Sequence, residues 1–592
     1  MTALRRSWCA FLITLLALPL SADLIVVLSI DQLRFDYVDR FAPWLTTRGF
    51  QRFTREGATF PNARFNYGAT STGPGHAAIS AGLTPAESGI VSNKWFERDA
   101  PVDARRWGWY FDDITAHLSP DLAKAPFDAA ADAWWKAGGS PRYCVYDERV
   151  TVTAGKTSGM SPSLLAGNAL GDRVKERYPH ARVISAGMKD HAVILMGGRG
   201  ADAAYWFDYH TPAFISSTWY RFNPAVFSFN ALIPGYIPAS ARWTPSPFIP
   251  RDELRRVTFD PPAAWPLKNT TYEGTFPHPI RTTRALTYTP FMHQMLFDFA
   301  YHVIATEELG AREGTPDLLF VAISSTDYVG HYYGPESMEV ADSMVRLDRS
   351  LADFLDALER RFGERLTVAL TSDHGVQPSP EIAKLRDPNA DAGRTDIRTP
   401  VPHAKKISDL PATRIEIEQK LAARLGVPFD RDAPLSHALV YFFEEPALWL
   451  NVRRLEQLNL DRERTKQALR DVMRALTHHG LAGAWTDTEL RTPNPTAPPL
   501  EQLMRNSYHP ARSGDVLMAL RPGWIWHWGS NSTTHGQPVD NDLRVPLMFW
   551  GAGIKPGVYT TPASPLDLPP TLGKLLGVEA GGVTARALPC VE

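Results

Sequence analysis

The stretch Leu24-Ile25-Val26-Val27-Leu28-Ser29-Ile30-Asp31 is an apolar, β-branched run that ends in a carboxylate. A continuous apolar run of this length is typical of a strand that is buried on both faces, as in a parallel sheet. Two later runs repeat the pattern, because residues 318–323 precede Asp327 and residues 366–370 precede Asp373. Ligands bind beyond the carboxyl ends of the strands in such sheets, so the three aspartates predict one shared site.

Helical patterns lie between these runs, at residues 164–178, 297–309 and 340–362, and the last is strongly amphipathic. Strands that alternate with helices predict a doubly wound α/β fold, in which a mostly parallel sheet is sandwiched by helices. Further expected elements are strands at 182–186, 515–520 and 545–550 and a closing helix at 566–576.

Two stretches interrupt the alternation of strands and helices. Residues near 197–290 are rich in aromatic side chains and proline, and residues near 376–440 mix proline with charge. We interpret both stretches as insertions that cap the site of a single domain spanning residues 23–592. The alternative for the aromatic side chains is that they pack under long loops, which is their commoner use.

The composition is that of a soluble globular protein. The chain has 592 residues, of which 44% are hydrophobic and 21% charged, and its formal net charge is -2. This balance produces no global field for nucleic acid or an anionic membrane, and we expect no nucleic-acid-binding surface.

The first 22 residues have the pattern of a signal peptide. Arg5 and Arg6 precede an apolar run at residues 11–20, and Leu20-Ser21-Ala22 is a small-residue cleavage signal. The run is shorter than the roughly 20 apolar residues that a membrane span needs, and no later segment is long and apolar enough. We therefore expect a periplasmic or secreted protein, with an uncleaved anchor as the alternative.

Three cysteines occur in the chain. Cys9 would leave with the signal peptide, so Cys144 and Cys590 remain. They either pair in an oxidising compartment or stay as two inert thiols.

Four short motifs carry the candidate metal ligands. Carboxylate and imidazole both suit zinc, and two zinc ions need about this many ligands. Each motif alone is weak, since an aspartate after a strand is more often a helix cap. Their order and their placement at strand ends make chance a poor explanation. The candidate ligands are Asp31, Asp327, His331, Asp373, His374 and His535.

A fifth motif, Thr70-Ser71-Thr72-Gly73-Pro74-Gly75-His76, supplies a candidate nucleophile. A hydroxyl before Gly-Pro-Gly and a helical pattern lies at a helix N-terminus, where backbone N–H groups favour anions. The alternative is an ordinary helix cap, and three hydroxyl residues compete for the role.

The five motifs, in this order, resemble the alkaline phosphatase superfamily, most closely its monomeric bacterial phosphatases of the threonine-nucleophile type. Nucleotide pyrophosphatase/phosphodiesterases share the motif order, and the resemblance extends from Asp31 to His535. It implies a monomer with two zinc ions and a covalent phosphothreonine intermediate at Thr72. In this resemblance Asp31, Asp373 and His374, together with the Thr72 oxygen, bind the zinc that activates the nucleophile. The other zinc is bound by Asp327, His331 and His535.

The resemblance also implies two substrate-binding residues. Asn93 matches an asparagine that holds a phosphoryl oxygen, and Lys156 lies where family phosphomonoesterases carry a lysine beside an arginine. No arginine lies between Arg149 and Arg173, so a guanidinium contact to a monoester dianion is missing. Lys156 is either the family lysine or a solvated loop residue. Lys189 also resembles part of a family segment, and we expect a scaffold role for it.

The predicted function is hydrolysis of small-molecule phosphate monoesters. The first alternative is a phosphodiesterase or nucleotide pyrophosphatase on the same site, which the missing arginine favours. The second is a non-catalytic zinc-containing protein that binds phosphorylated ligands, and the intact ligand set argues against it.

Overall fold

The computed structural model describes residues 22–103, 105–107, 110, 139–153, 158–237, 240–258, 276–398, 404–527 and 531–591. Apart from Ala22, the expected signal peptide lies outside these ranges, and so does Lys156. Across the ranges that are described, no helix combines the length and the apolarity that crossing a membrane requires.

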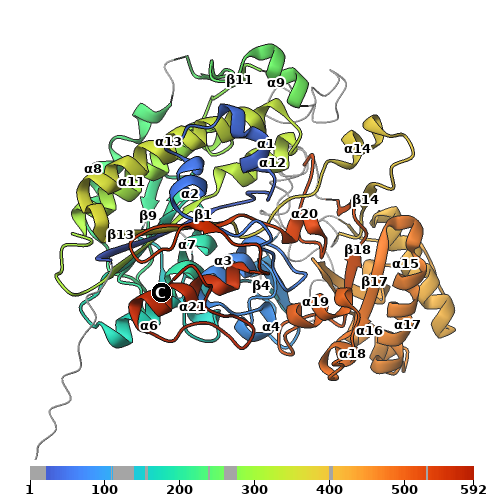
Figure 1. Ribbon diagram of the computed structural model, residues 1–592. Coiled ribbons are helices and arrows are strands. Elements are labelled where there is room, and N and C mark those ends of the chain that lie inside the picture. Colours follow the sequence, from blue (N-terminus) through green and yellow to red (C-terminus); the bar gives the residue numbers. More distant parts are fainter. Residues whose placement is uncertain are drawn as a thin grey trace, which may run out of the picture.

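A mixed, mostly parallel sheet forms the centre of the molecule, which confirms the predicted α/β class (Figure 1). The strands β13, β1, β12, β7 and β8 run parallel to one another, whereas β20 and β9 are antiparallel to their neighbours. In the described part of the chain the strand order is β21 (Gly557–Val558), β2 (Ala58–Thr59), β20 (Leu547–Gly551), β13 (Leu366–Thr371), β1 (Leu24–Ile30), β12 (Asp317–Ile323), β7 (Val183–Gly187), β8 (Ala203–Asp208) and β9 (Ala213–Ile215).

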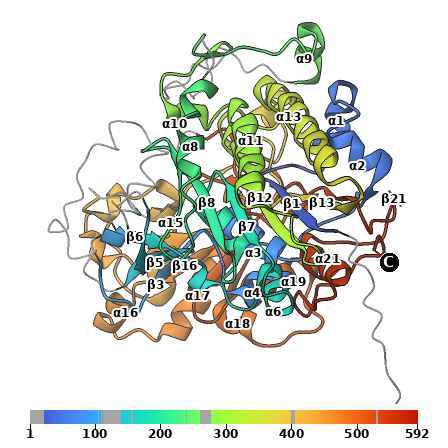
Figure 2. The same cartoon turned by 90° about the vertical axis from the view of Figure 1, so that its left-hand side faces the viewer.

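Both faces of the central sheet are covered by helices, so its strands are mostly apolar (Figures 1 and 2). On β1, Val26 and Leu28 join the core on the side of two long helices, while Ile25 and Val27 join the opposite core. Side chains alternate between the two faces of a strand, which explains why this run shows no polar alternation. The helices are α11 (Phe291–Thr306) and α13 (Met338–Phe362) on the first side, and α3 (Thr72–Ala81), α7 (Asp190–Gly197) and α21 (Leu568–Leu576) on the second.

The register of the three central strands brings their carboxyl ends to one edge. Ile30 of β1 lies opposite Ile323 of β12, and Ser29 lies opposite Thr371 of β13. The Asp31 backbone N–H donates to the Ile323 carbonyl at 3.0 Å, so the chain leaves β1 directly beside the end of β12.

A second, antiparallel sheet forms a separate lobe at one side of the central sheet (Figure 1). Helices α15 (Ala412–Leu425) and α17 (Arg462–Ala475) pack on it through a core that includes Leu421 and Leu469. The strand predicted at 515–520 belongs to this lobe. Its strand order is β15 (Val440–Glu444), β16 (Ala447–Leu450), β18 (Val516–Leu520) and β17 (Leu481–Thr486).

Two elements differ from the predicted ones. The helix expected at 164–178 is shorter, since α6 (Leu170–Arg177) begins only after Gly167, whose φ of 77° is left-handed and breaks the helix. The central sheet includes β8 and β9 from the stretch near 197–290, whereas the described residues of this stretch after Ile215 lie outside the sheet.

Candidate active site

One cluster of buried carboxylates and imidazoles lies at the carboxyl ends of β1, β12 and β13. His374 Nε2 is 3.4 Å from Asp31 Oδ1 and 3.3 Å from Asp373 Oδ2. The side chains of Asp31, Asp373 and His374 are fully buried. The three residues that the resemblance assigns to one ion are therefore close together.

The second predicted set of ligands lies beside the first. Asp327 and His331 lie one turn apart on α12 (Ser325–Tyr333), with His331 Nε2 3.1 Å from Asp327 Oδ1. His535 comes from a distant loop, and its Nε2 lies 3.7 Å from the same oxygen. One donor atom each from Asp327, His331 and His535 lies within 4.8 Å of the others, and the same holds for Asp31, Asp327 and His374. Asp327 thus belongs to both groups.

Backbone carbonyls orient all three histidines. The Nδ1–H groups of His331, His374 and His535 donate to the carbonyls of Thr533, Gly375 and Thr70 at 2.9, 2.9 and 2.8 Å, respectively. A carbonyl can only accept, so Nδ1 carries the proton and Nε2 keeps its lone pair in the neutral ring. This outer-shell arrangement is the usual one for histidines that bind metal ions.

Several buried polar atoms of the cluster lack hydrogen bonds. They are both Oδ atoms of Asp31, Asp373 Oδ2 and His374 Nε2. Burial, and then repulsion from Asp373, raise the pKa of Asp31 to about 7. Burial likewise raises the pKa of Asp373 to about 6. Buried carboxylates are costly unless they are fully partnered, and this donor set fits divalent metal ions that would supply further partners.

Thr72 is the hydroxyl residue that the fold brings against the cluster. It is buried at the start of α3, whereas the Thr70 hydroxyl donates at 3.4 Å to the Gln537 carbonyl. The two glycines of the motif permit this placement. A Cβ at Gly75 would lie 2.3 Å from the Asp373 carbonyl oxygen, and a Cβ at Gly73 would lie 3.2 Å from Asn93 Oδ1.

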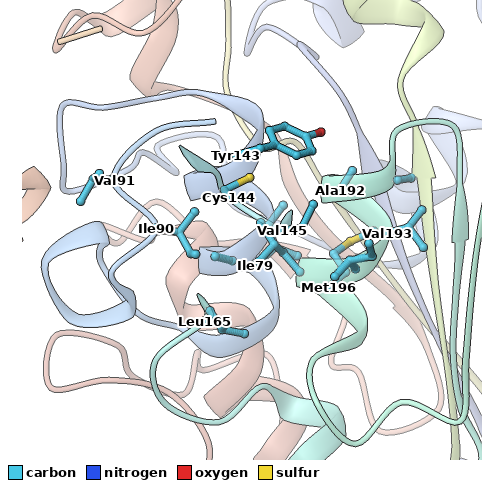
Figure 3. Close-up of a cluster of buried hydrophobic side chains, with 14 of the residues drawn as sticks. Ile79, Ile90, Val91, Tyr143, Cys144, Val145, Leu165, Ala192, Val193 and Met196 are labelled. Atoms are coloured by element: carbon cyan, nitrogen blue, oxygen red, sulfur yellow. The ribbon is translucent and has the colours of Figure 1, made fainter. Parts of the chain in front are cut away.

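A buried apolar cluster packs around Ile79 of α3 (Figure 3). Ile79 of α3 packs with Ile90 and Val145 and with Val193 and Met196 of α7. The short residues of the motif therefore approach the polar cluster at one end of α3, while its other turns are fixed by apolar contacts.

His76 connects α3 to the cluster. Its Nδ1–H donates to the Thr72 carbonyl at 2.8 Å, and the Ser29 hydroxyl donates to its Nε2 at 3.0 Å. Burial lowers the pKa of His76 to about 3, so the ring is neutral. Its Nδ1 also lies 3.3 Å from Asp373 Oδ2. The motif quoted for Thr72 contains His76, but its role was not predicted.

Lys189 lies in the middle of the cluster, which its expected scaffold role did not anticipate. Its Nζ is 2.8 Å from Asp31 Oδ2, 2.7 Å from Asp327 Oδ2 and 3.2 Å from Thr72 Oγ1. Although burial favours the neutral amine, Asp31 and Asp327 raise the pKa of Lys189 well above its usual value. The signal for this position was available, because Lys189 follows the strand run that becomes β7, the neighbour of β12.

Gln32 is a second residue whose role was not predicted. Its backbone adopts a φ of 63°, and its Nε2 donates to Asp327 Oδ1 at 2.5 Å. Gly330 makes room for it, since a Cβ there would lie 1.8 Å from Gln32 Oε1. Left-handed backbone at a non-glycine residue is sparsely populated and is common at functional sites.

Asn93 lies beside the first turn of α3. The Gly73 backbone N–H donates to Asn93 Oδ1 at 2.7 Å. This hydrogen bond fixes the orientation of the amide and leaves the Nδ2 hydrogens to donate to a ligand. The structure thus brings Asn93 next to Thr72, while Lys156 lies outside the described residues.

An aromatic wall lies next to Lys189. The Tyr328 ring centroid is 5.3 Å from Lys189 Nζ, and Tyr288 stacks on Tyr328 with ring centroids 4.8 Å apart. Tyr288 belongs to the aromatic stretch near 197–290, so part of that stretch does reach the site.

Cys144 and Cys590 are both free and buried, so the structure has two thiols rather than a disulfide.

Comparisons with known proteins agree with the sequence and the fold. Residues 25–538 match the family model described as type I phosphodiesterase / nucleotide pyrophosphatase. Alkaline phosphatase PhoK of Sphingomonas sp is 28% identical over 566 residues, which cover 93% of this chain and 88% of the relative. Alkaline phosphatase PhoV of Synechococcus elongatus is 28% identical over 579 residues, which cover 94% and 90%.

A solved structure shares the fold of nearly the whole chain. The crystal structure of alkaline phosphatase PafA aligns with a TM-score of 0.78 and 24% identity, covering 97% of this chain and 99% of the other. This likeness bears on the fold alone. Together with the family match, it confirms the resemblance to the alkaline phosphatase superfamily.

Proposed function

We propose that this chain, which belongs to the type I phosphodiesterase / nucleotide pyrophosphatase family, hydrolyses phosphate monoesters through Thr72 beside two zinc ions. That it is a phosphoric-ester hydrolase follows from its family and its relatives. The names of PhoK and PhoV favour monoesters as substrates.

One observation carries the proposal. Thr72 Oγ1 lies at a helix N-terminus, within hydrogen-bond distance of the Lys189 ammonium. The same ammonium contacts one carboxylate from each proposed ligand group, Asp31 and Asp327. A helix N-terminus and an ammonium beside the hydroxyl both favour a phosphoryl anion at this position. Two bound ions would supply Lewis-acid stabilisation of the charge on the attacking and leaving oxygens. Asp31, Asp373, His374 and the Thr72 oxygen would hold one ion, and Asp327, His331 and His535 the other.

The side chains of the site account for the rest of the reaction. The Lys189 ammonium, 3.2 Å from Thr72 Oγ1, favours the deprotonated hydroxyl. The Thr72 oxygen forms its bond to phosphorus while the bond from phosphorus to the leaving alcohol breaks, and water then cleaves the phosphothreonine. Asn93 Nδ2 and the backbone N–H of Thr72 donate to the phosphoryl oxygens as negative charge develops.

The second candidate is hydrolysis of phosphodiesters on the same site. It is favoured by the absence of an arginine between Arg149 and Arg173 and by the name of the family. A diester carries less charge than a monoester dianion, so it needs fewer cations. Lys156 is the single basic residue between Arg149 and Arg173. In the first proposal, hydrolysis of monoesters, Lys156 is the side chain that contacts the phosphate dianion.

The test compares rates for p-nitrophenyl phosphate and bis-p-nitrophenyl phosphate with purified protein that has been supplied with zinc, using Thr72→Ala as the control. We expect Thr72-dependent turnover with a preference for the monoester. Preference for the diester would establish the second candidate. Absence of Thr72-dependent turnover of either ester would overturn the proposal and favour a non-catalytic binding protein.

The N-terminal segment supports cleavage near Ala22 and a periplasmic or secreted location. The resemblance to monomeric bacterial phosphatases supports a monomer. N-terminal sequencing of the exported protein tests this: a sequence that still begins upstream of the apolar run at 11–20 would contradict cleavage.

A further inference from the structure

A second group of metal-ligating side chains lies in the lobe of the antiparallel sheet. Glu416 on α15 faces His478 and His479 on the short helix η8 (Thr477–His479), and one donor atom of each lies within 4.8 Å of the others. We propose that Glu416, His478 and His479 form a binding site for one zinc ion, separate from the active site.

The spacing of the donor atoms fits a single tetrahedral ion. His479 Nε2 lies 2.9 Å from Glu416 Oε2, and His478 Nε2 lies 3.4 Å from the same oxygen. Zinc bonds of roughly 2.0–2.1 Å at tetrahedral angles place neighbouring donors about 3.3 Å apart. The three side chains therefore need only small shifts to bind an ion between them.

The arrangement of the two histidines is unusual for neighbours in sequence. Adjacent residues of a helix project in different directions, yet the two rings are 4.2 Å apart and both Nε2 atoms face one carboxylate. A simple hydrogen bond to Glu416 would need only one of the two histidines. Two imidazoles and one carboxylate also select zinc over magnesium or calcium, which prefer oxygen ligands.

The backbone that carries the histidines is held from outside the cluster. Arg521 Nη1 donates to the Thr477 carbonyl at 2.8 Å, and the Thr395 hydroxyl donates to the His479 carbonyl. Gly480 ends η8 at a φ of 80°, where a Cβ would lie 2.2 Å from Trp524. The backbone that carries His478 and His479 is thus held in place before any ion binds. An ion bound to these residues and to Glu416 would join η8 to α15.

Solvent reaches the site, and one cation competes for it. The side chains of His478, Glu416 and His479 are 56%, 29% and 24% exposed, so an ion can enter and water can complete its coordination. Lys420 Nζ lies 2.9 Å from Glu416 Oε1 at a half-exposed position. It must turn into solvent when zinc binds, which its long side chain allows.

The test counts zinc equivalents in the full-length protein after equilibrium dialysis against excess zinc. The double variant His478→Ala/His479→Ala is expected to hold one equivalent fewer than the wild type, with rates on p-nitrophenyl phosphate unchanged. Glu416→Gln, which keeps the shape of the side chain, is expected to weaken the same equivalent. Lys420→Gln is expected to tighten it severalfold by removing the competitor.

The matched control is His437→Ala, an exposed histidine elsewhere in the same lobe, which should leave the count unchanged. Equal zinc counts in the wild type and the double variant would overturn the proposal. A lost equivalent accompanied by lost activity would assign that ion to the active site and would overturn it as well. Both results are independent of whether the active site prefers monoesters, because the comparison rests on the difference in zinc content.

Discussion

Lys189 Nζ lies 3.2 Å from Thr72 Oγ1, so a side chain from the end of β7 meets the proposed nucleophile at the start of α3. The same ammonium contacts one carboxylate of each proposed metal-ligand group, Asp31 and Asp327. Lys189 is therefore the cation that balances the buried negative charge of the site before metal ions are added.

Lys189→Met is expected to destabilise the metal-free protein much more than the zinc-loaded protein. Removing the partner of buried carboxylates costs on the order of 3 kcal/mol, whereas bound ions would supply the missing charge. Urea denaturation of both states measures the difference in free energy of unfolding. Lys175→Met, which removes a partly exposed pair with Asp202, is the control. An equal loss in both metal states would contradict this role of Lys189.

Asn93→Asp separates a phosphoryl contact from a purely structural role. An aspartate keeps an oxygen that accepts from the Gly73 N–H, so a structural role predicts little effect. A phosphoryl contact predicts that Asn93→Asp lowers kcat/KM more than Asn93→Ala, because a carboxylate repels the phosphoryl anion. Loss of one such donor costs about 100-fold. Steady-state kinetics of Asn93→Asp and Asn93→Ala distinguish the two roles. Near-normal activity of Asn93→Asp would exclude a contact between Asn93 and the phosphoryl group.

The affinity of the active site for zinc is expected to rise with pH up to about 7. In the metal-free protein the pKa of Asp31 is raised to about 7 and that of Asp373 to about 6, and zinc must displace their protons. A raised carboxyl pKa stabilises the folded state below the unfolded value of roughly 4, and this stabilisation is lost as the pH rises through the folded value.

The metal-free protein should therefore lose stability between about pH 4 and pH 7, over the interval set by the unfolded and folded pKa values. Zinc dissociation constants and melting curves across this range measure both effects. A zinc affinity that does not change between about pH 5.5 and pH 7 would mean that protons on Asp31 and Asp373 do not compete with the ion.

Lys156→Ala is expected to lower kcat/KM for p-nitrophenyl phosphate by about tenfold or more, through loss of a charge-assisted contact. The rate with bis-p-nitrophenyl phosphate should change little, because a diester has one negative charge fewer. The measurement is the ratio of the monoester rate to the diester rate, compared between the wild type and Lys156→Ala. Equal effects on both substrates would mean that Lys156 does not distinguish them.

The central sheet and the placement of three aspartates at its edge could be predicted because their signals are local. Residues of β1, β12 and β13 are mostly apolar, since both faces of these strands are buried, and each strand is followed by an aspartate. The rule that ligands lie beyond strand ends then brings Asp31, Asp327 and Asp373 together.

The parts that escaped prediction depend on long-range packing. β16 pairs with β18, so Leu448 meets Val516 across a long stretch of chain, and no local pattern records such a pairing. Lys189 was missed for a related reason. A lysine is most often solvated, and only the neighbouring positions of β7, β1 and β12 reveal that this one is surrounded by carboxylates.

The most direct test of the central claim is to quench the reaction with a radiolabelled phosphate monoester in acid and to map the label by peptide analysis. The account predicts covalent phosphate on Thr72 in the wild type and none in Thr72→Ala, which should also lose activity by at least about a thousandfold. Label on another residue, or full turnover by Thr72→Ala, would contradict phosphoryl transfer through Thr72.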